Sequence, residues 1–315
     1  MRIVFMGTPD FAVPSLEALL KSDDQVVGVV TQPDRPKGRG QDVIPSPVKV
    51  VCLREGIPLL QPLKMKDPAF LEVLRQWKPD IITVTAFGRI LPSAVLTLPP
   101  LGCINVHGSL LPKYRGAGPI QWAVIRGEQE TGITTMVMDE GMDTGDMLLQ
   151  EKVAILPEDT AGTLALRLAE VGGRVLVETL CRLKAETLIP QPQDHTLATM
   201  APLLKKEDGL IDWALTAREI ADRVRGLSPW PGAYTYVNGE RWTLCLVSVG
   251  EESQAAAPGM VTKVTKDRID VATGGGTIHM REIQPSNSRR MTVAQYLAGH
   301  RLAEGIGLQT APPLG

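Results

Sequence analysis

Residues 102–121 read GCINVHGSLLPKYRGAGPIQ, and residues 131–147 read TGITTMVMDEGMDTGDM. The first stretch opens with the apolar run Cys103–Val106, which predicts a buried strand. Gly108 ends that strand, and the prolines and glycines after it predict a tight loop. The second stretch predicts another apolar strand, Gly132–Met138, which runs into an acidic turn flanked by glycines. Strands of this kind favour an open α/β sheet, where ligands bind beyond the strand ends.

Three polar side chains fall at these predicted strand ends. Asn105 and His107 are two residues apart, so their side chains leave the same face of the strand, roughly 7 Å from each other. Asp143 follows 36 residues after His107, in the acidic turn. An isolated Asn-x-His pair is usually a strand end with satisfied polar groups. Together with the Asp143 carboxylate in the second turn, Asn105 and His107 form a candidate catalytic triad.

Composition sets limits on the class of protein. A chain of 315 residues with 43% hydrophobic content predicts two domains, each with its own core. The net charge of −2 argues against a polybasic nucleic-acid binder but leaves room for a locally basic surface. The four cysteines and four histidines are scattered and form no C-x-x-C pair, so we predict neither a disulfide framework nor a metal site. No apolar run reaches the roughly 18 residues of a membrane span, and the chain opens directly with a strand. We therefore expect a soluble, cytoplasmic protein without a membrane partner.

The N-terminal half alternates predicted strands and helices. The chain opens with a predicted βαβ unit, made of strand Arg2–Met6, helix Phe11–Lys21 and strand Gln25–Thr31. The turn after its first strand, Gly7–Asp10, holds one glycine, whereas a dinucleotide-binding fingerprint has three. We therefore predict a Rossmann-like parallel-sheet domain without a dinucleotide site. The further elements expected here are helix Val48–Arg54, strand Ile57–Leu60, helix Pro68–Trp77, strand Ile81–Phe87 and a long helix, Ala161–Lys184, with a possible bend at Gly172-Gly173.

The stretch Pro33–Pro47 is hydrophilic and shows no helix or strand periodicity. It contains Arg35, Lys37 and Arg39 between glycines and prolines. One interpretation is a solvated surface loop. The other, which we favour, is a basic flap that closes on an anionic polymer, since long structureless loops in compact domains are commonly functional.

The C-terminal part reads differently. Ala185–Asp208 is rich in Pro, Gln and Thr, Thr216–Glu219 matches a helix capping box, and Asn238-Gly239 predicts a hairpin turn. We predict short strands on both sides of that turn and at Met260–Val264, Ile269–Ala272 and Ile278–Ile283. Together they fit a small OB-like β-barrel, a fold that commonly binds oligonucleotides. The predicted domains are a catalytic domain (1–190), a linker (191–208) and an OB-like domain (209–315).

Taken together, these motifs resemble the folate-dependent formyltransferases. Seven segments carry the resemblance, and they occur in the order and spacing of that family over nearly the whole chain. They are MGTPDF, TQPDRPKGRG, PSPVKV, GCINVHGSLLP, ETGITTMVMDEGMDTGDM, IDW and SPWPGAY. The resemblance implies that the formyl group of the co-substrate 10-formyltetrahydrofolate passes to the free amino group of initiator methionyl-tRNA, for translation initiation. We expect a monomer that binds this folate and this tRNA and needs no metal.

The resemblance also implies roles for single residues. Asn105 and His107 would donate N–H groups to the tetrahedral oxyanion, and Asp143 would orient His107 or relay the proton of the amine. How the three divide these roles stays open. The expected folate contacts are Phe87, Gly88, Ile90, Leu91, Ser109, Leu110, Leu111, Pro112 and Asp139, and the expected tRNA contacts are Arg39, Lys37 and Arg35.

Two other functions remain open at this point. A formyltransferase that acts on a small-molecule amine would share Asn105, His107 and Asp143, but it would need neither the flap nor the C-terminal barrel. A non-catalytic RNA-binding protein would not need the triad.

Overall fold

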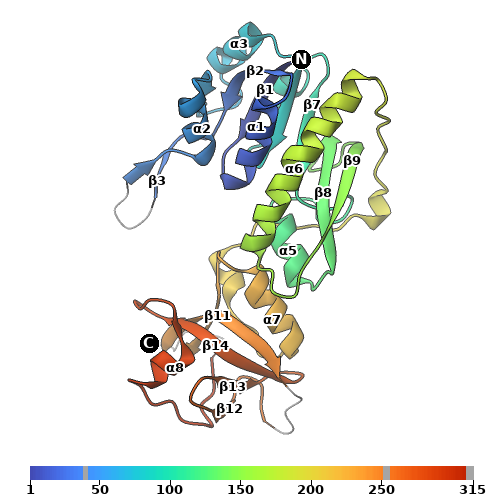
Figure 1. Ribbon diagram of the computed structural model, residues 1–315. Helices are drawn as coiled ribbons and strands as arrows, with labels where there is room; N and C mark the ends of the chain where they lie inside the picture. Colours follow the sequence, from blue (N-terminus) through green and yellow to red (C-terminus); the bar gives the residue numbers. More distant parts are fainter. Residues whose placement is uncertain (38–41, 251–255, 310–315) are drawn as a thin grey trace. The chain divides into compact units, whose positions relative to one another are not determined.

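The computed structural model describes residues 1–37, 42–250 and 256–309. The chain forms two compact units, each built from segments that are separate in the sequence (Figure 1). The first unit comprises residues 1–119, 130–154 and 165–202, and the second comprises residues 120–129, 155–164 and 203–315. Among the described residues, no helix has both the length and the apolar composition needed to cross a bilayer.

A seven-stranded sheet in the order β5-β2-β1-β6-β7-β8-β9 forms the centre of the first unit. The five strands from β5 to β7 run parallel, whereas β8 and β9 are antiparallel to their neighbours. This arrangement confirms the predicted parallel-sheet α/β domain. The strands are β1 (Arg2–Gly7), β2 (Gln25–Val30), β5 (Leu59–Leu60), β6 (Ile81–Thr85), β7 (Cys103–His107), β8 (Glu130–Val137) and β9 (Met147–Ala154).

The edge strand β9 was not predicted. From Leu149 its residues alternate between half-buried and exposed, so no buried apolar face forms, and it carries Glu151 and Lys152 in the middle of the strand. Charged residues are common on edge strands because they discourage pairing with other chains, but they also remove the apolar pattern that identifies a strand. The predicted strands Ile57–Leu60 and Ile81–Phe87 are shorter in the structure, at Leu59–Leu60 and Ile81–Thr85.

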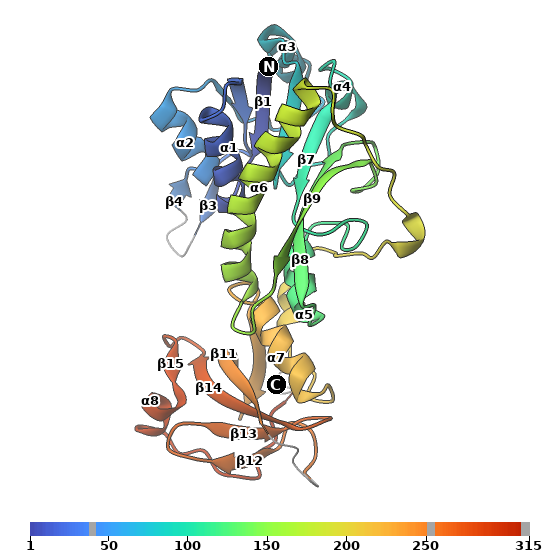
Figure 2. The same cartoon turned by 45° about the vertical axis from the view of Figure 1, so that its right-hand side comes forward.

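Helices of the first unit begin where capping residues and prolines allow. The Ser46 hydroxyl accepts from the Lys49 N–H at the start of α2, and the Asp67 carboxylate accepts from the Ala69 N–H at the start of α3. The predicted helix Phe11–Lys21 is a 3-10 turn, Asp10–Ala12, followed by α1. The helices are α1 (Val13–Leu20), α2 (Pro47–Glu55), α3 (Pro68–Trp77), α4 (Ser93–Leu96) and α6 (Ala161–Lys184), of which α1 and α6 lie side by side over one face of the sheet in Figures 1 and 2.

The glycine pair in α6 has a packing role. The helix is continuous from Ala161 to Lys184, so the bend considered at this pair does not interrupt it. A Cβ on Gly172 would lie 3.1 Å from Cγ1 of Val106, and a Cβ on Gly173 would lie 2.7 Å from the carbonyl oxygen of Pro14. The two glycines therefore let α6 approach both the sheet and α1 closely.

We expect Gly173→Ala to lower the melting temperature. Removing glycine from a helix interior stabilises the helix by about 1 kcal/mol, whereas overpacking against a backbone carbonyl costs about 1–3 kcal/mol. The net effect corresponds to a fall in Tm of roughly 2–4 °C in calorimetry. Glu170→Ala, at an exposed position of the same helix, is the control and should leave Tm nearly unchanged. A higher Tm for Gly173→Ala would mean that the Pro14 carbonyl moves aside at little cost.

The stretch Pro33–Pro47, predicted to lack secondary structure, contains two short strands. Backbone pairing joins β3 (Arg35–Lys37) to the antiparallel β4 (Asp42–Ile44), and the hairpin projects from the sheet in Figure 1. The prediction was wrong here because backbone hydrogen bonds, which leave no apolar period in the sequence, form this hairpin.

Side-chain contacts hold the base of the β3–β4 hairpin. Lys49 hydrogen-bonds to the Asp34 carboxylate, and this bond holds the pKa of Asp34 below its ordinary value. Gln61 supports the same pair, since its carbonyl oxygen accepts from Lys49 and its amide donates to Asp34, each at 2.9 Å. The hydroxyls of Thr31, before β3, and Ser46, after β4, lie 2.9 Å apart. The hairpin thus leaves the first unit from a fixed base.

The second unit contains an antiparallel sheet in the order β10-β11-β14-β13-β12, with β15 paired to β14. This confirms an antiparallel C-terminal β domain. The predicted hairpin turn at Asn238-Gly239 is present with φ values of 50° and 84°, and Thr216 and Glu219 form the predicted capping box. The elements are α5 (Pro119–Ile125), α7 (Ala217–Gly226), β10 (Ala233–Val237), β11 (Glu240–Gly250), β12 (Val261–Val264), β13 (Ile269–Ala272), β14 (Thr277–Pro285), β15 (Met291–Thr292) and α8 (Val293–Leu297).

Residues near the C-terminus link the two outer strands of this sheet. Gln309 exchanges backbone hydrogen bonds with Tyr236 of β10, and the Val261 N–H at the start of β12 donates to the Ile306 carbonyl. Trp213 and Trp242 lie in the core, each 2% exposed or less. A sheet joined across its edges in this way is compatible with a small barrel, although the OB-like assignment stays a prediction.

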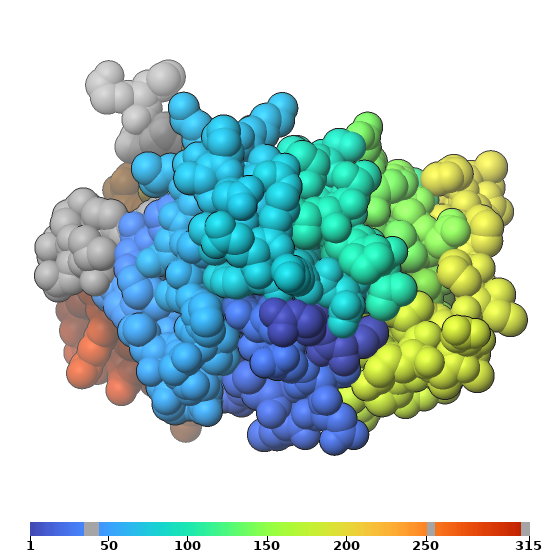
Figure 3. Space-filling model, turned by 90° about the horizontal axis from the view of Figure 1, so that it is seen from above, coloured from blue at the N-terminus to red at the C-terminus, as the bar shows by residue number. Residues whose placement is uncertain are grey.

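The segment predicted as a linker is ordered against the first unit up to Pro202. Gln191 exchanges backbone hydrogen bonds with Met147 of β9, and Arg115 does so with Thr199 and Ala201. In Figure 3 this segment is yellow and lies beside the green residues of the sheet's antiparallel margin. The predicted boundaries at 190 and 208 stay a prediction, but the chain between 191 and 202 is structurally part of the first unit.

Candidate active site

The structure brings His107 and Asp143 together. His107 ends β7, between β6 and β8, and Asp143 lies in the turn that joins β8 to β9. The distance from Nδ1 of His107 to Oδ2 of Asp143 is 3.7 Å. The histidine is only 5% exposed, whereas the aspartate side chain is 18% exposed. The histidine is therefore buried at the end of an inner strand, and the carboxylate beside it is partly reachable from outside.

A backbone contact orients the imidazole of His107. Its Nε2 lies 2.9 Å from the carbonyl oxygen of Tyr114. Because a carbonyl oxygen can only accept, Nε2 carries a proton whether the ring is neutral or charged. Nδ1 is therefore the nitrogen that faces Asp143 and can exchange a proton there.

Asp143 is held by its own backbone conformation and by its neighbours. Its φ is 54°, in the left-handed region that few residues other than glycine adopt, although Asp and Asn tolerate it best. The Gly116 N–H donates to Oδ2 of Asp143 at 2.8 Å. Gly116 itself has φ 114°, and a Cβ there would lie 2.8 Å from the Ala201 carbonyl oxygen. The loop thus needs glycine at this position to reach the carboxylate.

Asn105 presents its amide from the middle of the same strand, two residues before His107. Its side chain is half-buried, and within the described residues it makes no hydrogen bond. It stands on β7 opposite Val84 of β6 and Met136 of β8. An amide N–H₂ in this state can donate to a ligand oxygen without first breaking a protein contact.

The cysteine at the start of β7 does not supply a nucleophile. Burial raises the pKa of the Cys103 thiol to about 12, and the side chain is 1% exposed. The thiolate is the reactive form, so this thiol is inert near neutral pH. Within the part of the chain that the structure describes, no three His, Cys, Asp or Glu side chains gather as a metal site would require.

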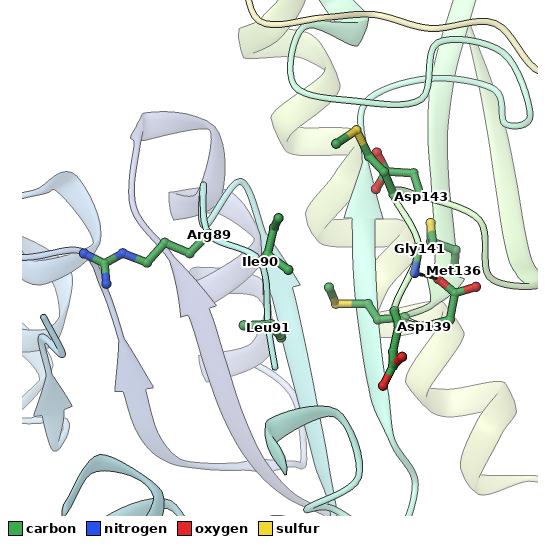
Figure 4. A pocket seen from close by; sticks show the side chains of 10 residues that line it. Arg89, Ile90, Leu91, Met136, Asp139, Gly141 and Asp143 are labelled. Carbon is green, nitrogen blue, oxygen red and sulfur yellow. Dashed lines mark hydrogen bonds between the residues drawn. The ribbon is translucent and has the colours of Figure 1, made fainter. Parts of the chain in front are cut away.

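A cavity of about 290 Å³ lies beside Asp143. In Figure 4, Ile90 and Leu91 face Asp139, Gly141 and Asp143 across it, and the Arg89 side chain points away. Arg89 donates to the carbonyls of Pro62 and Leu63 instead. The lining residues are Arg89, Ile90, Leu91, Met136, Met138, Asp139, Glu140, Gly141, Met142 and Asp143. The apolar walls and few polar groups are typical of a small-molecule pocket.

Only part of the predicted folate set lines this cavity. Ile90, Leu91 and Asp139 do, whereas Phe87, Gly88 and the segment Ser109–Pro112 do not. The sequence reasoning missed Met136 and Met138, although their place at the end of a strand next to the acidic turn was a usable signal. Contacts of the remaining residues with folate stay predictions.

Internal hydrogen bonds account for the segment Ser109–Pro112. The Leu111 N–H donates to Oγ1 of Thr134 at 3.1 Å, and the Leu111 carbonyl accepts from Gln150 at 2.8 Å. Ser109 is fully buried and its hydroxyl donates to the Lys113 carbonyl. These hydrogen bonds fix the conformation of Ser109–Pro112, which is the first part of the loop that follows His107.

The predicted tRNA contacts cannot be placed in the site. Arg35 and Lys37 contribute backbone to β3, and their side chains are not described. Arg39 lies outside the described residues. Their predicted contacts stay predictions.

Comparison with known families identifies the class of enzyme to which this fold and candidate site belong. Residues 1–180 match the formyl transferase family, and residues 203–301 match the formyl transferase C-terminal domain. The chain belongs to the formyl transferase family.

Curated relatives extend the match to nearly the full chain. The chain is 53% identical over 310 residues to a methionyl-tRNA formyltransferase of Desulfotalea psychrophila, covering 98% of this chain and 96% of the relative. It is 51% identical to a methionyl-tRNA formyltransferase of Acetivibrio thermocellus, covering 97% and 98% of the two chains.

Solved structures share the fold at low identity. An N-formyltransferase from Helicobacter canadensis in complex with folinic acid and dTDP-3-aminofucose matches with a TM-score of 0.67 and 20% identity, over 88% of this chain and 98% of that one. HypX from Aquifex aeolicus in complex with tetrahydrofolic acid matches with a TM-score of 0.62 and 16% identity, over 97% of this chain. This chain spans about half the length of HypX, 50% of that chain.

Proposed function

We propose that this protein transfers the formyl group of 10-formyltetrahydrofolate to the free amino group of initiator methionyl-tRNA, giving N-formylmethionyl-tRNA for translation initiation. The observation that carries the proposal is about 50% identity over nearly the whole chain to methionyl-tRNA formyltransferases. The pair His107–Asp143, at the end of β7 and beside an apolar cavity, supplies the chemical groups that this reaction needs.

The reaction moves one formyl group and one proton. The neutral amine attacks the formyl carbon, and a tetrahedral intermediate forms with its charge on the former carbonyl oxygen. The amine then loses a proton, the bond from carbon to N10 of the folate breaks, and N10 gains a proton. The protein must therefore stabilise an oxyanion and move a proton between two nitrogens.

We assign these tasks to the three side chains. Asn105 donates its free amide N–H to the oxyanion. Since Nε2 of His107 is bound to Tyr114, Nδ1 is the atom that works at the reaction centre, as a donor when protonated. Asp143, 3.7 Å from Nδ1, stabilises the charged imidazole or accepts the proton of the amine. Its partly exposed carboxylate is compatible with the second task.

We propose that the folate occupies the cavity between Ile90–Leu91 and the Asp139–Asp143 turn. Phe87, Gly88 and Ser109–Pro112, which do not line this cavity, remain proposed folate contacts. Structural neighbours bound to folinic acid or tetrahydrofolic acid support a folate co-substrate in this fold. We expect the reaction to need no metal.

The tRNA is proposed to contact the β3–β4 hairpin and the C-terminal domain. Residues 1–190 would hold the chemical site, 191–208 would connect the domains, and 209–315 would form an OB-like tRNA-binding domain. We further propose that the enzyme is a cytoplasmic monomer. Linkage of the C-terminal segment to both outer strands is compatible with the OB-like assignment.

The function is tested by incubating the purified protein with 10-formyltetrahydrofolate and charged methionyl-tRNA, then measuring the mass gain at the aminoacyl end. Formylation of methionyl-tRNA and none of free small amines supports the proposal. The alternative is a formyltransferase that acts on a small amine. The Helicobacter canadensis neighbour, an N-formyltransferase in complex with dTDP-3-aminofucose, is the observation that favours this alternative. Formylation of such an amine alone would favour the alternative.

Arg39→Ala should raise KM for methionyl-tRNA about tenfold or more and leave folate affinity unchanged. The expectation rests on the basic composition of the stretch that contains it, because arginine neutralises phosphate charge. Steady-state kinetics and a folate fluorescence titration measure the two effects. Arg75→Ala, which removes an exposed arginine on α3, is the matched control. Equal losses in tRNA use and in folate binding would contradict the assignment.

A further inference from the structure

Two buried polar residues outside the triad connect its parts. Arg115 and Gln193 are each only 6% exposed. The Gln193 amide oxygen accepts from Nε of Arg115 at 3.0 Å and from Nη2 at 2.6 Å. Nη2 also lies 3.1 Å from Nδ1 of His195. Two donors from one guanidinium fix the orientation of the Gln193 amide.

The other end of Gln193 contacts the turn that carries Asp143. Its amide nitrogen donates to the backbone carbonyl of Asp143 at 2.9 Å and to that of Gly145 at 2.7 Å. Both N–H groups of the amide are thereby used, and the acceptors lie on either side of Thr144. The side chain therefore clamps the backbone of this turn.

The same short loop contacts every member of this arrangement. Tyr114 accepts from His107, Arg115 holds Gln193, and the Gly116 N–H binds the Asp143 carboxylate. These three successive residues thus link the imidazole of His107, the carboxylate of Asp143 and, through Gln193, the backbone of the turn that carries Asp143. A displacement of the turn at Asp143 would break contacts at both ends of this chain of interactions.

We propose that Arg115 and Gln193 are positioning residues that hold Asp143 in register with His107. The proposal rests on the proposed function, because it assigns these residues to that reaction. Asp143 has a φ of 54°, a sparsely populated conformation that persists only when its surroundings fix it. The clamp on the carbonyls of Asp143 and Gly145 supplies such a constraint, and it comes from the segment that composition alone marks as a linker.

The expected effect of losing the clamp follows from geometry. Displacing a catalytic group by about 1 Å can cost about 10²-fold in rate. Gln193→Glu keeps the size of the side chain and its acceptor for Arg115, but it places a carboxylate oxygen against two backbone carbonyls. We expect kcat to fall between about 10- and 100-fold, with KM for the folate changed less than about threefold.

The matched control is Gln191→Glu, the same chemical change two residues earlier. Gln191 is exposed and contacts the sheet through its backbone, which pairs with Met147. Its substitution should leave kcat within about twofold of wild type. Circular dichroism and thermal melts show whether each variant is folded.

A double-mutant cycle separates positioning from general structural support. If Gln193 acts through Asp143, then Asp143→Asn combined with Gln193→Glu should lower kcat no further than Asp143→Asn alone. Arg115→Lys, which keeps the charge but loses the paired donors, should show the same non-additivity with a smaller loss, and it serves if Gln193→Glu does not fold. Losses that multiply in these cycles, or wild-type kcat in a folded Gln193→Glu, would overturn the positioning role.

The wild-type protein is assayed first. Absence of methionyl-tRNA formylation by the wild type would contradict the proposed function itself. If the wild type is active but the control Gln191→Glu is inactive, the proposed function stands and the positioning role of Gln193 is overturned. Residues around position 191 would then matter for activity without the hydrogen bonds that Gln193 makes.

Discussion

Asp143→Asn is expected to lower kcat for formylation about 10²-fold or more, equivalent to about 2.7 kcal/mol of transition-state stabilisation. Asparagine has the same shape and tolerates the left-handed backbone conformation at this position. It can also accept the hydrogen bond from Gly116. The substitution therefore removes mainly the negative charge that faces Nδ1 of His107 at 3.7 Å.

Single-turnover formylation of methionyl-tRNA with saturating folate measures this effect on the chemical step. Asp146→Asn is the matched control, because Asp146 is exposed in the same turn and uses its backbone carbonyl, not its side chain, to bind Val137. Near-normal turnover by a folded Asp143→Asn protein would remove Asp143 from the mechanism.

A fragment of residues 1–202 is expected to bind folate but to lose about 10²-fold or more in kcat/KM for methionyl-tRNA, because phosphate contacts supply much of the affinity of a protein for nucleic acid. The chemical groups of the candidate site all precede Pro202. An end point near Gln193, suggested by composition, would delete Thr199 and Ala201, which hydrogen-bond to Arg115. The fragment should therefore extend to Pro202.

Folding of this fragment must be measured before its activity. Trp122 and Ile125 of α5 pack against the core of the second unit, so the fragment exposes them. Folate titration and circular dichroism supply the control. In the full-length protein, tRNA affinity should fall steeply with salt while folate affinity changes little. A folded fragment that formylates methionyl-tRNA as well as the full chain does would assign the C-terminal domain another role.

The sequence by itself determined the fold class and predicted the residues of the candidate site. Apolar runs such as Ile81–Thr85 are typical of parallel strands covered on both faces, and Asn238-Gly239 and the Thr216–Glu219 box specify a turn and a helix start by local chemistry. These features depend on neighbours within a few residues, so the sequence shows them directly. The order and spacing of its motifs also predicted the family, which the comparisons confirmed.

Only the tertiary structure decided how the candidate site is held together. Gln193 lies in a stretch of proline, glutamine and threonine that reads as a linker, yet it is buried against Arg115 and the backbone of Asp143. The nitrogen of His107 that faces Asp143 was likewise undetermined until the Tyr114 carbonyl was found at Nε2. Both facts rest on contacts between residues seven to 78 positions apart. Hydrogen bonds of this kind follow from the packing of the chain and leave no periodic or compositional signal in it.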